Sequence, residues 1–200
     1  MNLIQLPEPK FDSGISIEKA LQNRQSFREF RKEPLGIADI SQLLWAAQGV
    51  THDRYLRTVP SAGALYPLEV YVVVGKVEDL TPAVYKYKPT GHKLIRIIEG
   101  DKRVELYMAA LGQPWVRDSA LVLVFSAVYK RATIKYEQRG VRYVTIEVGL
   151  AAQNVYLQTV SLGLGTVFVG AFSDDKVREV LNIEEEEHPL CIMPIGKVKG

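Results

Sequence analysis

The spacing of apolar residues predicts two helices in the first quarter of the chain. Apolar residues recur at helical intervals from residue 17 to residue 21, and Ser16 stands before them, where its side-chain oxygen can cap the first turn. A longer apolar stripe covers residues 37–48. Gly49 follows that stripe and is expected to end the second helix.

Short runs of β-branched and aromatic residues predict a set of strands. The runs cover residues 68–74, 84–87, 94–98, 121–125, 166–169 and 190–195. The turn-forming residues 89–92 separate the second and third runs, which indicates a hairpin. The run 121–125 is apolar without interruption, so we expect that strand to be covered on both faces.

The longest helical pattern lies in residues 142–162, and Gly163 is expected to end it. Apolar and small residues occupy more than one side of this helix, which favours a central helix, buried in the fold or at a subunit interface. Shorter helices are expected from a cap at Asp101 to Gly112, over residues 130–138 and over residues 174–181. Strands and helices do not alternate regularly, and no linker or repeat interrupts residues 1–200. We therefore predict one domain of the α+β class.

Composition adds limits to this picture. Hydrophobic residues make up 47% of the chain, enough for a core, and the formal net charge of +2 gives no reason to expect nucleic acid or membrane as a partner. The single cysteine, Cys191, cannot form an internal disulfide and is expected to be buried and inert. The first residues do not resemble a signal peptide, so we expect a cytoplasmic protein. The acidic run 184–187 is expected to be a solvated loop.

Several chemistries lack the residue patterns they need. His52, His92 and His188 show no paired spacing and no cysteine pair exists, so no metal site is predicted. Ser61 is not in a Gly-x-Ser-x-Gly elbow. The glycines of residues 163–170 follow a helix, whereas a dinucleotide fingerprint precedes one. We predict no catalytic side chain, and expect a bound organic cofactor to supply the reactive atoms.

Residues 24–28 hold two guanidinium groups and a hydroxyl within five positions. Arg24, Ser26 and Arg28 offer the forked, charge-assisted donors that bind a phosphate. Lys197 could add a further cation. The alternative interpretation is a solvated helix face for the arginines and a solvated tail for the lysine.

A flavin mononucleotide (FMN) also needs close backbone approach to a flat ring, which small side chains permit. The residues suited to that approach are Gly63, Gly165, Gly170 and Ala171. Leu65 and Val169 are candidates for an apolar wall against the ring. The alternatives are a simple turn before a strand at residues 60–67 and a helix cap at Gly163.

Taken together, these segments resemble the nitroreductase family of flavin-dependent oxidoreductases. Residues 24–28 match its Arg-x-Ser-x-Arg motif, residues 162–172 its glycine loop, and residues 190–197 its closing strand. Residues 60–67 match its Pro-Ser-x-x-Asn-x-Gln-Pro segment, except that Ala64 and Tyr66 replace Asn and Gln. That variant is similar to the SagB-type azoline dehydrogenases of modified-peptide biosynthesis, which carry Pro-Ser-Ala-Gly-Ala-x-Tyr-Pro.

The resemblance implies a mostly antiparallel sheet flanked by helices, in a homodimer built around the long helix. It implies FMN at the subunit interface, reduced by NAD(P)H and reoxidised by ping-pong transfer to a small organic substrate such as a nitroaromatic, quinone or enone. We expect Gly149, Ala152 and Gln153 to lie near the partner subunit. The cofactor-binding residues expected are Arg24, Gln25, Ser26, Arg28, Pro60, Ser61, Ala62, Gly63, Ala64, Leu65, Val169, Gly170, Ala171 and Lys197.

Two alternatives stay open at this point. One is an azoline-type dehydrogenase that oxidises a peptide-derived heterocycle, which the Ala64 and Tyr66 variant favours. The other is a flavin-binding module without turnover.

Overall fold

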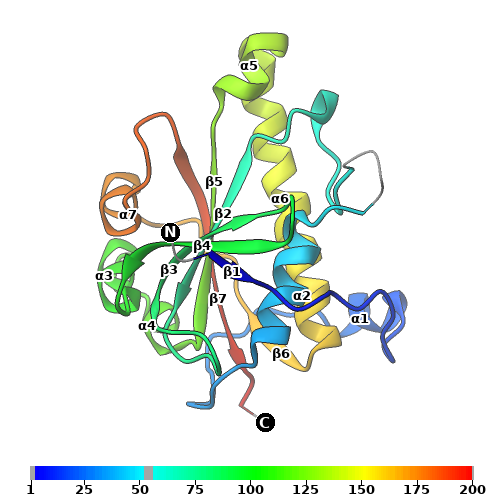
Figure 1. Cartoon of the computed structure of the whole chain (residues 1–200), viewed down its shortest axis with the longest axis vertical. Coiled ribbons are helices and arrows are strands. Elements are labelled where there is room, and N and C mark those ends of the chain that lie inside the picture. The colour runs from blue at the N-terminus through cyan, green and yellow to red at the C-terminus, as the bar shows by residue number, and fades with distance from the viewer. Residues whose placement is uncertain (1–2, 52–55, 200) are drawn as a thin grey trace.

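A seven-stranded antiparallel sheet forms the middle layer of the fold (Figure 1). The structure, a computed structural model, describes residues 3–51 and 56–199, so His52 lies outside the described residues. The strand order is β1-β4-β3-β2-β5-β7-β6, and every neighbouring pair is antiparallel. The strands are β1 (Leu3–Gln5), β2 (Leu68–Val74), β3 (Ala83–Lys88), β4 (Lys93–Glu99), β5 (Leu121–Ala127), β6 (Leu164–Thr166) and β7 (His188–Lys197).

Helices cover both faces of this sheet, which confirms the predicted α+β class (Figure 1). One face is covered by α2 (Ile37–Gln48) and the 24-residue α6 (Gln138–Ser161), with α1 (Ile17–Asn23) packed on α6 and α5 (Lys130–Tyr136) before it. The opposite face carries α3 (Arg103–Ala109), α4 (Pro114–Asp118) and α7 (Asp174–Leu181). The apolar core is correspondingly split into two clusters, one on each face. Every residue of β5 is buried, as its unbroken apolar run predicts.

Three elements differ from the sequence predictions. β1 and α4 were not expected, because three and five residues are too short to show a period. The strand expected at residues 166–169 is instead β6, which ends at Thr166. The chain leaves the ladder there because the Phe168 N–H donates to the Tyr156 hydroxyl at 2.8 Å, and Val169 keeps only an isolated bridge to Ile192.

Two further expectations, the start of α6 and the exposure of the acidic run, need correction. α6 begins at Gln138, four residues earlier than expected, because only Glu137, at φ +49°, separates it from α5. The acidic run was expected to be solvated, and residues 184–186 are exposed. Glu187 is buried, however, and its carboxylate lies 2.8 Å from Lys86 Nζ and 2.5 Å from the Ser126 hydroxyl. The ion pair compensates for the burial of that charge.

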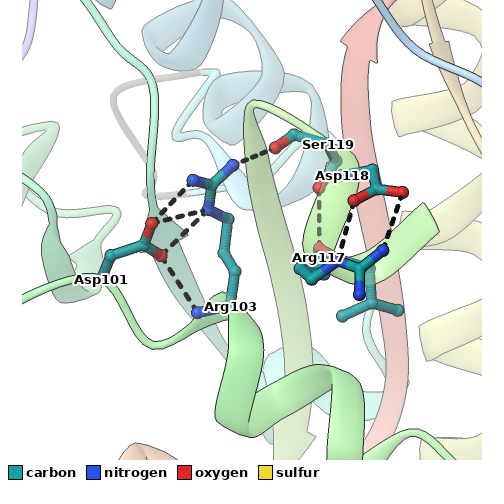
Figure 2. Close-up of polar contacts among 6 residues, drawn as sticks. Asp101, Arg103, Arg117, Asp118 and Ser119 are labelled. Atoms are coloured by element: carbon teal, nitrogen blue, oxygen red, sulfur yellow. Dashed lines mark hydrogen bonds and ion pairs between the residues drawn. The ribbon is translucent and has the colours of Figure 1, made fainter. Parts of the chain in front are cut away.

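A buried arginine of α3, Arg103, binds the residue that follows α4, Ser119 (Figure 2). Arg103 donates to both carboxylate oxygens of Asp101, at 2.6–3.2 Å, and to the Ser119 carbonyl. Asp101 also accepts from the Arg103 backbone N–H at 3.1 Å, so it binds the first turn of α3 as expected, although the helix itself begins at Arg103. A Cβ at Gly75 would overlap the guanidinium, so the cluster requires glycine at that position.

The N-terminal segment is tied to the sheet through a half-buried histidine, His92. The Ser41 hydroxyl donates to the Pro7 carbonyl, so it must accept from His92 Nε2–H, 2.6 Å away. The other ring nitrogen, Nδ1, then accepts from the Tyr87 hydroxyl at 2.8 Å. The neutral ring satisfies both nitrogens in this tautomer, and burial lowers the pKa of His92 below its ordinary value.

This network predicts a loss of stability in mild acid. Because the folded chain holds His92 neutral, its contribution is complete above the ordinary pKa of about 6.5 and is lost as the pH falls below that value. We expect the melting temperature to fall between about pH 7 and pH 5, and to fall less steeply in His92→Gln than in the wild type. Calorimetry of both proteins, with the exposed His188→Gln as control, measures the difference. Parallel curves for all three would contradict the network.

No helix in residues 3–51 or 56–199 is long and apolar enough to cross a membrane. In the same residues, no group of three or more His, Cys, Asp or Glu side chains is placed to hold a metal ion. Cys191 is fully buried on β7, and burial raises the pKa of its thiol.

Candidate functional site

One group of predicted site residues gathers around Tyr156, in the C-terminal half of α6. Arg24 ends α1, and its guanidinium carbon lies 5.2 Å from the centroid of the Tyr156 ring. The Ser26 hydroxyl lies 3.0 Å from the Tyr156 hydroxyl, which also accepts from Phe168 N–H. Tyr156 thus links residues 24–26 to the segment that precedes Val169. The sequence offered one clue to it, a polar aromatic in a helix of small and apolar residues.

Backbone contacts hold the arginine segment along the sheet edge. The Phe27 N–H donates to the Thr166 carbonyl on β6, and the Arg31 N–H donates to the Lys197 carbonyl on β7, each at 2.8 Å. A Cβ at Gly165 would lie 2.8 Å from the Phe27 Cβ, so this approach requires the glycine. The Lys197 ammonium is engaged with Glu33 at 3.1 Å. Residues 24–28 and Lys197 therefore lie on adjacent segments, as a shared ligand would require.

The remaining residues of this first group lie toward α4. The Arg28 guanidinium carbon is 5.5 Å from the Trp115 ring centroid. The Ala171 carbonyl accepts from Gln113 Nε2 at 2.8 Å. Val169 is buried, whereas Gly170, Ala171 and Gln25 are exposed.

Two polar atoms of this region are buried without a partner. Among the described residues, neither the Thr166 hydroxyl nor the Trp115 indole N–H makes a hydrogen bond. Thr166 accepts Phe27 N–H through its carbonyl, so the backbone of Thr166 lies beside the arginine segment. Buried polar groups are normally satisfied, so these two atoms are unsatisfied polar groups in the region of the predicted site.

The second group is the loop of residues 60–67, around the short helix η1 (Ala62–Ala64). Its backbone turns sharply: Gly63, Ala64 and Tyr66 have φ of +64°, +54° and +45°. The Ser61 hydroxyl accepts the Tyr66 N–H at 2.9 Å and closes the turn. Left-handed conformations of non-glycine residues are costly and cluster at functional segments. Local bonds therefore fix the shape of this loop.

Residues that the sequence did not single out surround the loop. A Cβ at Gly63 would lie 2.8 Å from the Tyr136 hydroxyl and 3.1 Å from Lys135 Nζ, so the end of α5 covers that position. On the other side, the Arg57 guanidinium carbon lies 4.2 Å from the Tyr66 ring centroid, and Arg57 donates to Gln48 Oε1 at 2.7 Å.

Glu147 of α6 contributes a carboxyl to the same place. It is 3% exposed, and its Oε1 has no hydrogen-bond partner among the described residues. Burial raises the pKa of Glu147 to about 7, while the Ser61 hydroxyl and the Arg57 guanidinium lower it. A lone carboxylate in an otherwise apolar stretch of α6 was the signal that could have found it.

The two groups do not meet within one chain. The first contacts α6 at Tyr156 and the second at Glu147, nine residues apart, which is about 14 Å along a helix. None of the hydrogen bonds, ion pairs or ring contacts between described residues joins one group to the other. One protomer therefore presents two separate parts of the predicted site.

An exposed apolar face of α6 lies between these two parts. Ile146 and Leu150 are 52% and 42% exposed, and a Cβ at Gly149 would meet no atom within 4 Å. Gln153 is also exposed on this face. Ala152, expected beside a partner, is 3% exposed and packs in the core of its own chain, so that expectation is wrong for its side chain.

A cleft of about 840 Å³ adjoins the same face, between α1, α2 and the C-terminal half of α6. The residues that line it include Phe11, Ile17, Trp45 and Gln158. Neither predicted group of site residues lines this cleft, so the cleft is separate from both parts of the predicted site.

Comparison with known proteins places the whole chain among one set of relatives. It is 48% identical over 194 residues to MJ1384 of Methanocaldococcus jannaschii, a protein named as a nitroreductase, covering 97% of this chain and 96% of that protein. A Staphylococcus epidermidis protein named NADPH-dependent oxidoreductase is 26% identical over 195 residues, covering 90% of this chain and 64% of that protein.

Solved structures agree. A nitroreductase-named protein of Ralstonia eutropha JMP134 superposes with a TM-score of 0.87 at 31% identity, covering all of this chain and 91% of that one. A chain of the Escherichia coli microcin synthetase McbBCD, solved with truncated pro-MccB17, superposes with a TM-score of 0.76 at 28% identity. The match covers 98% of this chain and 78% of that one.

The profile of the nitroreductase family matches residues 21–197, a range that includes both groups of predicted site residues. This match covers most of the chain, and the antiparallel sheet flanked by helices is the fold of the similar structures. The chain therefore belongs to the nitroreductase family.

Proposed function

We propose that this chain is an FMN-dependent oxidoreductase of the cytoplasm, which takes electrons from NAD(P)H and passes them to a small organic acceptor such as a nitroaromatic, quinone or enone. Membership of the nitroreductase family supports an oxidoreductase. Relatives named NADPH-dependent oxidoreductase support the nicotinamide donor. The observation that carries the proposal is the cluster of Arg24, Ser26 and Tyr156, on the segment that lies along β6.

The residues present suit the phosphate end of FMN. Arg24, Arg28 and Ser26 can donate charge-assisted and neutral hydrogen bonds to its oxygens, and Lys197 can add charge if it leaves Glu33. Gly165 lets residues 24–28 lie close to β6, and the exposed Gly170 and Ala171 leave room for a flat ring. Bound there, the flavin would supply the electron transfer, and the chain would supply position and hydrogen bonds.

The arrangement of the two groups on α6 supports a homodimer. A twofold axis near residues 149–153 would bring the 60–67 loop of one subunit toward the Arg24–Tyr156 group of the other. The exposed Ile146, Leu150 and Gly149 lie at that position, between the groups. We propose that each flavin site is completed by the partner's loop.

One alternative has an observation in its favour. The 60–67 loop carries Ala64 and Tyr66, and Lys135 and Tyr136 lie over Gly63, where an ammonium and a phenol could exchange protons with a substrate. McbC of Escherichia coli, named for the processing of microcin B17, is similar to this chain. An azoline-type dehydrogenase that oxidises a peptide-derived heterocycle is therefore the second candidate. A flavin-binding module without turnover is the remaining one.

Anaerobic mixing with each nicotinamide distinguishes these functions. Purified yellow protein should lose its flavin absorbance with NADPH or NADH, and an added quinone or nitroaromatic should restore it. A protein that stays yellow with both nicotinamides would contradict the proposed reductase. Bleaching by a thiazoline peptide instead would favour the dehydrogenase, and bleaching by no donor would favour the module.

The cofactor itself is predicted to be FMN rather than FAD. The described donor set suits one terminal phosphate, and the sequence has no Gly-x-Gly-x-x-Gly segment for a dinucleotide. Heating the purified or reconstituted protein and separating the released flavin by chromatography gives the result directly. Recovery of FAD, or failure to retain any flavin after reconstitution, would contradict the prediction.

A further inference from the structure

A second cleft, of about 530 Å³, lies between the end of α2, the start of β2 and the hairpin of β3 and β4. None of the predicted site residues lines it. Four of its lining residues are cations and one is a carboxylate, so the described lining carries an excess of positive charge. The charged and amide side chains of this lining are Gln48, Arg57, Glu69, Lys88, Lys93 and Arg131.

The carboxylate of this lining, Glu69, is already neutralised. Its oxygens lie 2.5 Å from the Arg131 guanidinium and 3.4 Å from Lys86 Nζ. It therefore has little charge to offer the other cations of the cleft. The lining cations that take part in no ion pair between described residues are Arg57, Lys88 and Lys93.

Two of these cations stand opposite each other across the hairpin. Lys88 ends β3, Lys93 begins β4, and the two are partners in the antiparallel ladder. Side chains at directly opposite positions lie on the same face of the sheet, and like charges there destabilise the pair. Both lysines are half-buried, which reduces their screening by water. An anion bound beside both ammonium groups would replace this repulsion with attraction.

The third cation, Arg57, is held in place without a carboxylate. Its Nη1 donates to Gln48 Oε1 at 2.7 Å, and its guanidinium carbon lies 4.2 Å from the Tyr66 ring centroid. Gln48 is 1% exposed, and its Nε2 has no hydrogen-bond partner among the described residues. Burial lowers the pKa of Arg57, and the charges of Glu69 and Glu147 act against that effect without forming an ion pair with it. A half-buried guanidinium of this kind is stabilised by a counterion.

We propose that this cleft binds a phosphate monoester through Arg57, Lys88 and Lys93. A phosphate monoester carries nearly two negative charges at neutral pH, which suits three cations better than a single carboxylate does. The guanidinium fork matches phosphate oxygens, and Gln48 fixes the direction of that fork.

The cleft adjoins the 60–67 loop, because Arg57 stacks on Tyr66 and Arg131 donates to the Tyr66 carbonyl at 3.0 Å. Two kinds of molecule would bring a phosphate monoester to this place. One is NADPH, which differs from NADH by this group alone, and the other is a phosphorylated substrate. The choice of NADPH rests on the proposed function, whereas the presence of the phosphate site does not.

Isothermal titration of the FMN-loaded protein with inorganic phosphate, at low salt, tests the site. Arg57→Gln and the double variant Lys88→Gln/Lys93→Gln should each bind phosphate about tenfold more weakly than the wild type. Lys176→Gln and the double variant Lys76→Gln/Lys176→Gln remove the same charges from exposed positions and should bind as the wild type does. No binding by the wild type, or equal binding by all five proteins, would overturn the proposal.

Melting temperatures show whether the opposed lysines behave as the proposal requires. Without phosphate at low salt, Lys88→Gln should melt at a higher temperature than the wild type, because the repulsion with Lys93 is removed. Added phosphate should raise the melting temperature of the wild type more than that of the variant. A variant that melts lower than the wild type without phosphate, or that gains as much from phosphate, would contradict the site.

Steady-state kinetics then distinguishes the two sources of the phosphate. If NADPH supplies it, Arg57→Gln should raise the ratio of the KM for NADPH to the KM for NADH by about tenfold. An unchanged ratio together with weakened phosphate binding assigns the site to a phosphorylated substrate. A wild type that retains no FMN would overturn the proposed function alone. The phosphate titration would then be made with Arg24→Ala/Arg28→Ala, which lacks the other candidate phosphate-binding arginines.

Discussion

Replacing Arg24 and Arg28 together with Ala is expected to weaken FMN binding by orders of magnitude while the fold stays intact. Each guanidinium stacks on an aromatic ring, and no carboxylate of the described residues pairs with either, so both charges are available to a phosphate. Hydrogen bonds to charged groups contribute about 1.5–3 kcal/mol each, so losing two predicts a loss of roughly 10²–10⁴-fold in affinity. Single Arg→Lys variants should lose less, because the charge survives without the fork.

Flavin titration at constant salt measures this effect, and circular dichroism checks the fold. Arg139→Ala is a matched control, since Arg139 also stacks on a tyrosine, at 5.8 Å from the Tyr143 ring centroid, but belongs to neither group. If the double variant binds FMN as tightly as the control, Arg24 and Arg28 are a solvated helix face.

Gly149→Glu is expected to split the proposed dimer and release the flavin. A glutamate there would place an unpaired charge at the proposed seam, at a cost of several kcal/mol in the dimer, about 2–5 by the usual penalties. If the protein is instead a monomer, the same substitution is expected to increase its stability. A Cβ at Gly149 meets open space, and replacing a helical glycine should stabilise a monomer by roughly 0.5–1 kcal/mol. A dimer should therefore be destabilised by Gly149→Glu, whereas a monomer should be slightly stabilised.

Analytical ultracentrifugation with flavin absorbance followed in the same run decides between them. Met108→Glu on α3 is the control, because Met108 is an exposed apolar residue on the opposite helical layer. Ala152→Glu is not a suitable test, since Ala152 packs in the core and its replacement should unfold the protomer itself. A wild-type monomer that keeps its flavin at micromolar concentration would rule out a site shared between subunits.

The fold was predictable wherever the apolar pattern was long. The stripe at residues 37–48 gave α2 with its observed ends, and the apolar run in β5 gave a strand buried on both faces. The pattern did not reveal β1, α4 or the early start of α6. The first two are too short to show a period, and the break at Glu137 depends on one backbone angle. Glu187 was misjudged because its partner, Lys86, is 101 residues away in sequence.

The candidate site was predictable only where its residues form a contiguous sequence motif. Residues 24–28 and 60–67 are contiguous, so their composition carries the signal. Tyr156, Trp115 and Glu147 lie beside segments that are distant in sequence, so local composition offers at most the presence of Tyr156 and Glu147 in α6 and not their neighbours. The side of α6 that faces outward was also hidden, because small residues occur all around it. Gly149 and Ala152 therefore looked equivalent in the sequence, although one is open and the other is buried.

The interval between Glu147 and Tyr156 fixes an angle as well as a length. Nine residues at about 100° each make two and a half turns, so the two side chains leave α6 on opposite sides, with the exposed stripe between them. One residue inserted anywhere between them would keep every contact residue and yet rotate one group by about 100° against the other. A change in length between these two positions would therefore alter how the two groups are placed relative to each other, whereas a substitution would leave that relation unchanged.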